Sequence, residues 1–247
     1  MVATRKGIAE YGLRSLEIFY LPIKDIRHDG NIAYVTQLRI NDPDMGVVID
    51  DAFMPVAERT VISEKITSWL IENLFMDMER FLNREIEAQW YSIYIPIRIL
   101  TKLSFMEEFF DTAKQKNYDL SKLCFAFNNK ILYEDHNVMT GLFARLKLEG
   151  MKTMITDFGD SFSPINRIAD IKPDYVFLNE SVVDSLTSDN MDKKALALNL
   201  YDVLNKIDVR VITPSVDEDK ILELIPEEHT LYSGKLVGGY RKARSVR

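Results

Sequence analysis

The sequence predicts one α/β domain, and two observations carry this prediction. Short β-like runs alternate along the chain with amphipathic stretches long enough to form helices. The 247 residues are 47% hydrophobic and 28% charged, which is enough apolar material for one large core. We find no low-complexity linker and no internal repeat. Strand and helix units of this length are typical of a parallel sheet covered by helices, and periodicity alone does not choose between an open sheet and a barrel.

The N-terminal third is expected to hold two strands and one long helix. The strands are predicted over residues 18–23 and 32–39, and the Asp29-Gly30 pair between them is a strong hairpin signal, so they should pair antiparallel. The helix is predicted over residues 63–83, with Ser63 as its N-cap. Its apolar face should pack in the core and consists of Ile66, Trp69, Leu70, Leu74, Met78 and Phe81.

The rest of the chain continues the alternation. Further strands are predicted over residues 90–97, 123–127, 153–157, 175–178 and 209–212, with a last weak strand near 231–233. Helices are predicted between them over residues 105–116, 137–148, 191–206 and 216–224. These repeated units extend the prediction of a parallel sheet to the C-terminal part of the chain.

Charge and cysteine content narrow the functional classes. A net charge of -7 argues against nonspecific binding to nucleic acid or to an anionic membrane, since both require a basic surface. The basic stretch from Arg241 to Arg244 is expected to be a solvated end. Cys124 is the single cysteine, which excludes an internal disulfide and fits a reducing cytoplasm. No apolar run approaches the roughly 20 residues that span a bilayer, so we expect a soluble cytoplasmic protein.

Several segments resemble the motifs of one family, in the same order and at similar spacing. Phe19-Tyr-Leu-Pro-Ile23 is similar to a YQPI strand, and Asp51-Ala-Phe-Met-Pro-Val-Ala-Glu58 is similar to FIPxAE. Ile155-Thr-Asp-Phe-Gly159 is similar to a strand that ends in DDFG, and the segment from Pro173 to Val183 parallels VDYLKIDRSFV. These motifs belong to the EAL family of bacterial cyclic di-GMP phosphodiesterases.

The resemblance implies a fold and a domain organisation. It implies the modified TIM-like (β/α)8 barrel of the EAL type, whose first strand runs antiparallel to the others. The hairpin signal at Asp29-Gly30 agrees with that arrangement. We therefore expect an N-terminal extension or short helix over residues 1–16, an EAL-like barrel over 17–240 and a basic tail over 241–247.

The resemblance also shows which family positions are changed. An EAL phosphodiesterase is expected to hold divalent ions through carboxylates and an Asn, and these ions activate water against a phosphodiester. Of the DDFG pair, the second carboxylate, Asp157, is retained. We therefore predict a degenerate EAL domain with no metal, no cofactor and no enzymatic activity. The aligned positions that differ from the family are Val35, Tyr94, Ala126, Thr156, Phe177, Pro214 and Ser233.

Three functions stay open at this point. The favoured one is a catalytically inactive EAL-like domain that acts as a regulatory protein-interaction module in bacterial signalling. The alternative is a metal-independent cyclic di-GMP receptor that uses Arg39 and Asp157, because the Arg of the EALLR signature contacts a phosphate in the family. If Arg39 binds no ligand, we expect it to be a strand-end residue that pairs with an acid such as Asp157 or is exposed to water. An active phosphodiesterase is the third and least favoured hypothesis.

Each hypothesis predicts a different barrel mouth. An interaction module predicts a mouth filled by Tyr94 and Phe177, a receptor predicts an open groove beside Arg39, and a phosphodiesterase predicts an open acidic mouth with metal. The partner of an interaction module would be an unknown protein or a second copy of the chain. Because family dimers form near the segment after DDFG, Phe162 and Ile165 are candidate dimer contacts, with packing on the barrel as the equal alternative.

Overall fold

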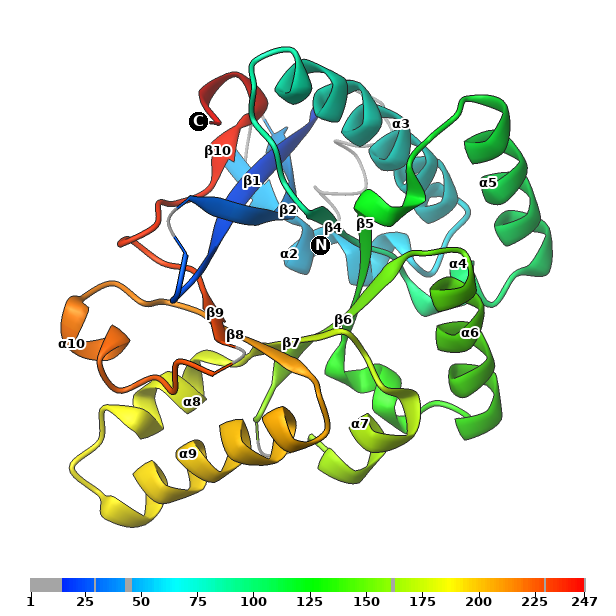
Figure 1. The fold of residues 1–247 in the computed structure, drawn as a ribbon. Helices are drawn as coiled ribbons and strands as arrows, with labels where there is room; N and C mark the ends of the chain where they lie inside the picture. The colour runs from blue at the N-terminus through cyan, green and yellow to red at the C-terminus, as the bar shows by residue number, and fades with distance from the viewer. Residues whose placement is uncertain (1–14, 29, 43–45, 161–162, 229, 247) are drawn as a thin grey trace.

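The computed structural model describes residues 15–28, 30–42, 46–160, 163–228 and 230–246, and its strands form a closed ring (Figure 1). Hydrogen bonding runs in the order β1-β9-β8-β7-β6-β5-β4-β2 and returns from β2 to β1. The ring strands are β1 (Leu16–Asp25), β2 (Asn31–Asp42), β4 (Trp90–Tyr94), β5 (Leu123–Asn128), β6 (Lys152–Phe158), β7 (Tyr175–Leu178), β8 (Arg210–Thr213) and β9 (Thr230–Tyr232).

Strand directions match the prediction. β1 runs antiparallel to both of its ring neighbours, β2 and β9. The other neighbouring pairs in the ring, from β2–β4 round to β8–β9, are parallel. The predicted TIM-like barrel with an antiparallel first strand is therefore confirmed. Two short strands extend the sheet outside the ring: β3 (Gly46–Ile49) pairs with β2, and β10 (Arg241–Lys242) pairs with β1.

Helices surround the ring, as parallel strands require (Figure 1). On α3 the predicted apolar face is confirmed, because Ile66, Leu70, Leu74 and Phe81 are buried. In the described part of the chain, no helix has both the length and the apolar character to cross a bilayer. The helices are α2 (Asp50–Ala57), α3 (Ile62–Leu82), α4 (Ile97–Leu100), α5 (Leu103–Gln115), α6 (His136–Leu148), α7 (Ile165–Ile171), α8 (Glu180–Leu186), α9 (Met191–Lys206) and α10 (Asp219–Leu222), with 3-10 turns at Leu120–Lys122, Asn129–Tyr133 and Ala243–Ser245.

The interior of the ring is filled at one end. Its apolar side chains lie toward the N-terminal ends of the parallel strands, which leaves the opposite end, where those strands finish, to carry function. We call these apolar side chains the plug. Cys124 is one of them, and complete burial raises the pKa of its thiol well above the ordinary value. That environment is typical of an inert thiol. The plug consists of Ile23, Ala33, Trp90, Cys124, Ala126, Met154, Tyr175, Ile212 and Leu231.

Three local predictions were wrong. The helix predicted over residues 216–224 is reduced to α10, because the Val216 backbone N–H donates to the Ser233 carbonyl and ties that segment to the barrel. The strand predicted over 90–97 ends at Tyr94, since Pro96 precedes the short helix α4. Ser63 is not an N-cap: α3 begins at Ile62, and the Ser63 hydroxyl donates to the Thr60 carbonyl.

The C-terminal residues, expected as a solvated basic tail, are part of the fold. Lys242 stands opposite Phe19 in the β1–β10 pairing, and its ammonium lies 2.6 Å from the Glu17 carboxylate. Arg84 of the loop after α3 donates to the carbonyls of Ala243 and Val246, and Val246 is buried. Of the N-terminal extension expected over residues 1–16, residues 1–14 lie outside the described residues, and Leu16 is already the first residue of β1.

Candidate functional site

Most of the changed family positions lie at or near the strand ends that form the barrel mouth, whereas Ala126 belongs to the plug inside the ring and Val35 packs on it. Register places Tyr94 beside Ala126, and Phe177 beside Ile212 of the next strand. Val35 and Phe177 are half-buried and pack on the plug, whereas Ala126, Pro214 and Ser233 are buried. Buried and half-buried side chains therefore line these strand ends.

Tyr94 links the end of β4 to the end of α2. Its hydroxyl donates to the Glu58 carboxylate at 2.9 Å, and the side chain is half-buried. Burial, followed by the nearby Glu58 charge, raises the pKa of Tyr94 above its ordinary value. Tyr94 is therefore a neutral donor that ties the end of β4 to the residue that follows α2.

Asp157, the retained carboxylate, is held in an unusual backbone conformation. Its φ of 56° lies in the left-handed region, just where the pairing of β6 with β7 changes register between Ile155 and Phe158. The Asn128 amide donates to the Asp157 carboxylate at 2.6 Å, and the Asn129 amide donates to the Asp157 carbonyl at 2.9 Å. Desolvation by its surroundings, and then the charge of Asp51, raise the pKa of Asp157. Among the contacts of the described residues, side-chain amides hold Asp157 in place.

Two other polar groups near Asp157 serve the local structure. The Thr156 hydroxyl donates to the Phe127 carbonyl at 3.3 Å. Asn179, which follows β7, accepts the Ser181 backbone N–H at 3.0 Å and so caps α8. These oxygens are already engaged in hydrogen bonds within the fold.

Arg39 lies on the inner side of β2 near the mouth. Its guanidinium carbon is 3.9 Å from the centre of the Phe19 ring and 5.4 Å from that of Tyr240, and its Nε donates to the Gln37 side chain at 2.9 Å. Among the ion pairs of the described residues, none involves Arg39. The expected pairing of Arg39 with Asp157 is therefore absent from the described part of the molecule, and the two ligand-binding candidates are not joined by an ion pair.

The structure shows acidic groups on α2 that were not among the predicted site residues. Asp50 accepts the Leu38 backbone N–H at 2.9 Å, and burial raises the pKa of Asp50 to about 6. The charge of Asp51 acts on Asp157 and on Tyr240. Asp51 and Glu58 belong to the segment that resembles FIPxAE. This motif could therefore have indicated them as site residues, but it was used only to identify the fold.

The donor set does not fit the pair of divalent ions that the family resemblance implies. Within the described ranges, no group of three or more His, Cys, Asp or Glu side chains is placed to hold a metal ion. The carboxylates of Asp50, Glu58 and Asp157 each accept a hydrogen bond from a different partner. Hard cations need several converging oxygen ligands, and these carboxylates each serve a separate contact of the fold.

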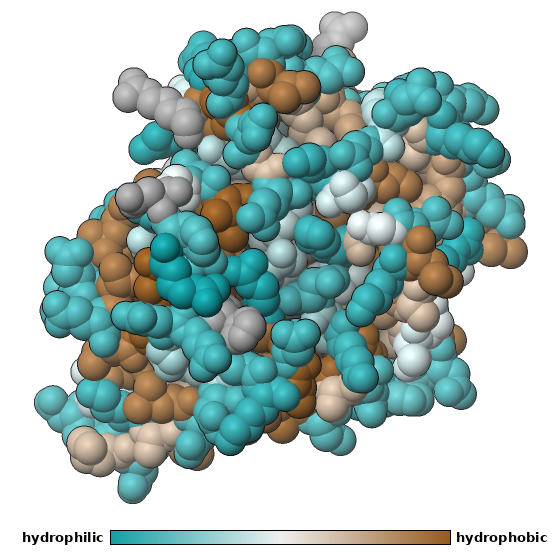
Figure 2. Space-filling model, in the orientation of Figure 1, coloured by the Kyte–Doolittle hydropathy of each residue, from teal (hydrophilic) through white to brown (hydrophobic). Residues whose placement is uncertain are grey.

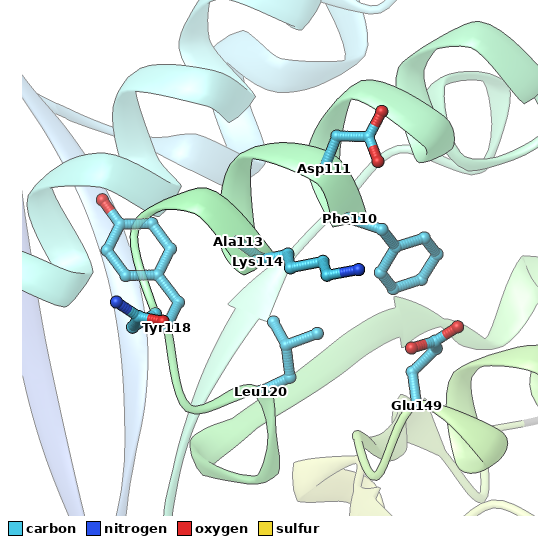
Figure 3. Close-up of a pocket in the computed structure, with 8 residues that line it drawn as sticks. Phe110, Asp111, Ala113, Lys114, Tyr118, Leu120 and Glu149 are labelled. Carbon is cyan, nitrogen blue, oxygen red and sulfur yellow. The ribbon is translucent and has the colours of Figure 1, made fainter.

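Two surface cavities lie away from Arg39. The larger, of about 500 Å³, lies between α5 and the end of α6, and its walls include Phe110, Lys114, Leu120 and Glu149 (Figure 3). The smaller, of about 240 Å³, lies between α8 and α9 next to Gly159. Both are grooves on the outer helical layer.

The predicted contact residues after β6 have different outcomes. Phe162 lies outside the described residues. Ile165 is the first residue of α7 and is 38% exposed, so it is available at the surface. Its role as a dimer contact stays a prediction.

Comparison with known proteins matches residues 9–229 to the EAL domain family. Among curated proteins, the chain is 22% identical over 196 residues to a cyclic di-GMP phosphodiesterase of Pseudomonas aeruginosa, covering 76% of this chain and 32% of the relative. It is 20% identical over 222 residues to the probable cyclic di-GMP phosphodiesterase PdeB of Escherichia coli, covering 90% of this chain and 42% of the relative. The chain therefore spans less than half of the length of these curated relatives.

Solved structures support the same fold. The phosphodiesterase MucR in its cyclic di-GMP complex aligns with a TM-score of 0.84 at 16% identity, covering 98% of this chain and 97% of that chain. The FimX EAL domain of Pseudomonas aeruginosa bound to cyclic di-GMP aligns with a TM-score of 0.80 at 18% identity, covering 98% and 96%. At these identities the likeness establishes the fold.

The comparisons overturn one prediction. We expected from the changed positions that the chain is not an enzyme. Curated relatives are named cyclic di-GMP phosphodiesterases, and one matched structure is described as an EAL enzyme, so membership of this group contradicts that expectation. The changed positions are sequence differences from the family, and these differences alone do not establish that activity is lost.

Proposed function

Because this chain belongs to the EAL domain family, we propose that it binds cyclic di-GMP at the barrel mouth, with Arg39 as the phosphate-binding residue. The proposal rests on the contacts of the Arg39 guanidinium. Its guanidinium rests on Phe19, and none of the described ion pairs neutralises it. A planar guanidinium suits a phosphodiester, because its forked N–H groups match two phosphate oxygens.

The acidic residues of α2 complement the guanine bases of the ligand. Guanine presents N–H donors on its edge, and carboxylates such as Asp51 accept hydrogen bonds from such donors. The charge of Asp51 raises the pKa of both Tyr240 and Asp157, which supports a position of Asp51 near the mouth. Arg39 would bind a phosphate while a carboxylate reads a base. The role of Asp157 as a ligand-binding residue stays part of this proposal.

Binding is proposed to be independent of divalent metal. The carboxylates at the mouth accept hydrogen bonds from Leu38, Tyr94 and Asn128, which supports a mode carried by side chains alone. MucR and the FimX EAL domain are each described with cyclic di-GMP bound, which makes this ligand the first to test.

Isothermal titration with cyclic di-GMP tests the proposal, with and without magnesium or manganese. We expect metal-independent binding by the wild-type chain and at least about tenfold weaker binding by Arg39→Ala, since a lost charge-assisted hydrogen bond costs about 1.5–3 kcal/mol. Lys220→Ala removes the same charge from an exposed residue of α10 and should bind as the wild type does.

Two results would contradict the proposal. Heat only in the presence of metal would exclude the metal-independent mode, and no heat at high ligand concentration would exclude the receptor function. The same samples are assayed for hydrolysis products, because curated relatives carry the name phosphodiesterase.

A regulatory contact with a protein is the second candidate function. Apolar side chains project from α9, where Met191 is 73% and Leu196 is 70% exposed, and Figure 2 shows apolar surface over this part of the molecule. Leu196 also lines the groove between α8 and α9, and Ile165 is exposed at the start of α7. We propose that this surface contacts a partner protein or a second copy of the chain.

Light scattering during size exclusion tests the second candidate with Leu196→Glu. Self-association by the wild type that is lost in this variant would support a homodimer. Val61→Glu changes an exposed residue that precedes α3 and serves as the control. Monomers of both wild type and Leu196→Glu at every concentration would exclude the second copy as the partner. A cytoplasmic location also stays a prediction.

A further inference from the structure

A polar side chain, Gln37, lies on the inner side of β2 next to Arg39. Neighbouring residues of a strand point to opposite faces, so Val35, Gln37 and Arg39 share one face. Val35 packs on the plug inside the ring, whereas Leu38 and Ile40 belong to the outer core beneath the helices. Gln37 therefore lies inside the barrel, between the plug and the mouth.

The contacts of Gln37 and Phe19 fix the Arg39 guanidinium from two directions. Gln37 Oε1 accepts the Arg39 Nε–H at 2.9 Å, and this hydrogen bond holds one edge of the guanidinium. Phe19, directly opposite Gln37 in the β1–β2 pairing, lies against its flat face at 3.9 Å. Both contacts come from adjacent ring strands, so the orientation of Arg39 is set by the barrel itself.

This arrangement selects one way of binding an anion. A guanidinium can bind two oxygens side-on, through Nε and one Nη, or end-on, through both Nη atoms. Because Nε already donates to Gln37, the side-on edge is occupied. None of the hydrogen bonds of the described residues uses an Nη atom of Arg39. The end-on edge is the one that a ligand would meet.

We propose that Gln37 is a positioning residue that orients Arg39 to bind a phosphodiester end-on through its two Nη atoms. This inference rests on the proposed binding of cyclic di-GMP. An uncharged amide suits the role, because it accepts the Nε–H without neutralising the guanidinium as a carboxylate would. An apolar residue at position 37 offers no acceptor, so Arg39 would lose this restraint.

Titration with cyclic di-GMP tests the inference in a double-mutant cycle. Gln37→Met keeps the length of the side chain and removes the acceptor, and Gln37→Leu is a second variant in case the first packs poorly. We expect each to bind about fivefold more weakly than the wild type, since a lost restraint of this kind is worth about 1 kcal/mol. In the Arg39→Ala background, the same changes should have no further effect. An equal loss of affinity in both backgrounds would overturn the inference.

The Nε–H resonance of Arg39, observed by NMR without ligand, separates this inference from the proposed function. In the wild type we expect a resonance slow to exchange with water, and in Gln37→Met a resonance that exchanges faster. An unchanged Nε–H in Gln37→Met would overturn the positioning role even if the ligand binds. Absence of binding by the wild type would instead count against the proposed function, and the Nε–H comparison would still decide whether Gln37 positions Arg39.

Discussion

Asp50 illustrates at the residue scale how the fold changes the chemistry of a side chain. Burial raises its pKa from 3.8 to about 6, against the opposing effect of the Leu38 N–H that it accepts. A raised pKa means that the neutral form is favoured by folding. Its contribution to stability is therefore complete below about pH 4 and is lost as the pH rises through 6.

We predict that Asp50→Asn stabilises the protein at pH 7.5 and has little effect at pH 4. Asn keeps an oxygen for the Leu38 N–H and removes the buried charge, so the gain should be about 1–2 kcal/mol at pH 7.5. Urea unfolding at the two pH values measures it. Asp51→Asn, at the exposed neighbouring residue, should give a smaller gain. A gain for Asp50→Asn that is the same at both pH values would show that ionisation is not the cause.

Sequence reasoning could place the strand-end residues at the mouth, but not their contacts. Arg39 and Asp157 are located by the resemblance, whereas the Arg39 to Gln37 hydrogen bond depends on side-chain conformations inside the ring. Asp50 was missed because its pKa depends on a hydrogen bond from β2 and on its burial at the start of α2. Such properties arise from tertiary contacts, and local sequence patterns do not contain them.

At the scale of elements, long periodic segments were predictable and short ones were not. The predicted helix over 191–206 coincides with α9, and the apolar face predicted for 63–83 is found on α3. α2 was missed because it is eight residues long and contains Pro55, which weakens a helical pattern. The pairing of β10 with β1 depends on a partner more than 200 residues away, and its basic sequence suggested a solvated end.

We predict opposite effects for Ala at two glycines. Gly159 follows β6 with a φ of +95°, and an added Cβ would lie 2.6 Å from Val182 Cγ2, so Gly159→Ala should cost about 2–4 kcal/mol of stability. Gly141 lies in α6 with open space around it, so Gly141→Ala should stabilise by about 0.5–1 kcal/mol. Urea unfolding of both variants measures the effects. A loss for Gly141→Ala as large as that for Gly159→Ala would contradict the steric argument.

At the scale of the whole molecule, the described residues form one closed unit. β1 pairs with β2, β9 and β10, so segments from both ends of the described chain meet on one strand. The Arg84 contacts to Ala243 and Val246 tie the last residues to the end of α3. We therefore expect the barrel to unfold as one cooperative unit, which makes ligand binding measurable as a change in the melting temperature.

We predict that cyclic di-GMP raises the melting temperature of the whole barrel without added metal. At a free concentration about 100 times the Kd, binding adds about 2.7 kcal/mol, which corresponds to a rise of about 5–10 °C for a chain of this size. For Arg39→Ala, with about tenfold weaker binding, the same ligand concentration should give about half of that stabilisation. Scanning calorimetry with and without a metal chelator measures both. An equal rise for the two proteins would remove Arg39 from the site, and a rise abolished by the chelator would show that the mouth recruits a metal after all.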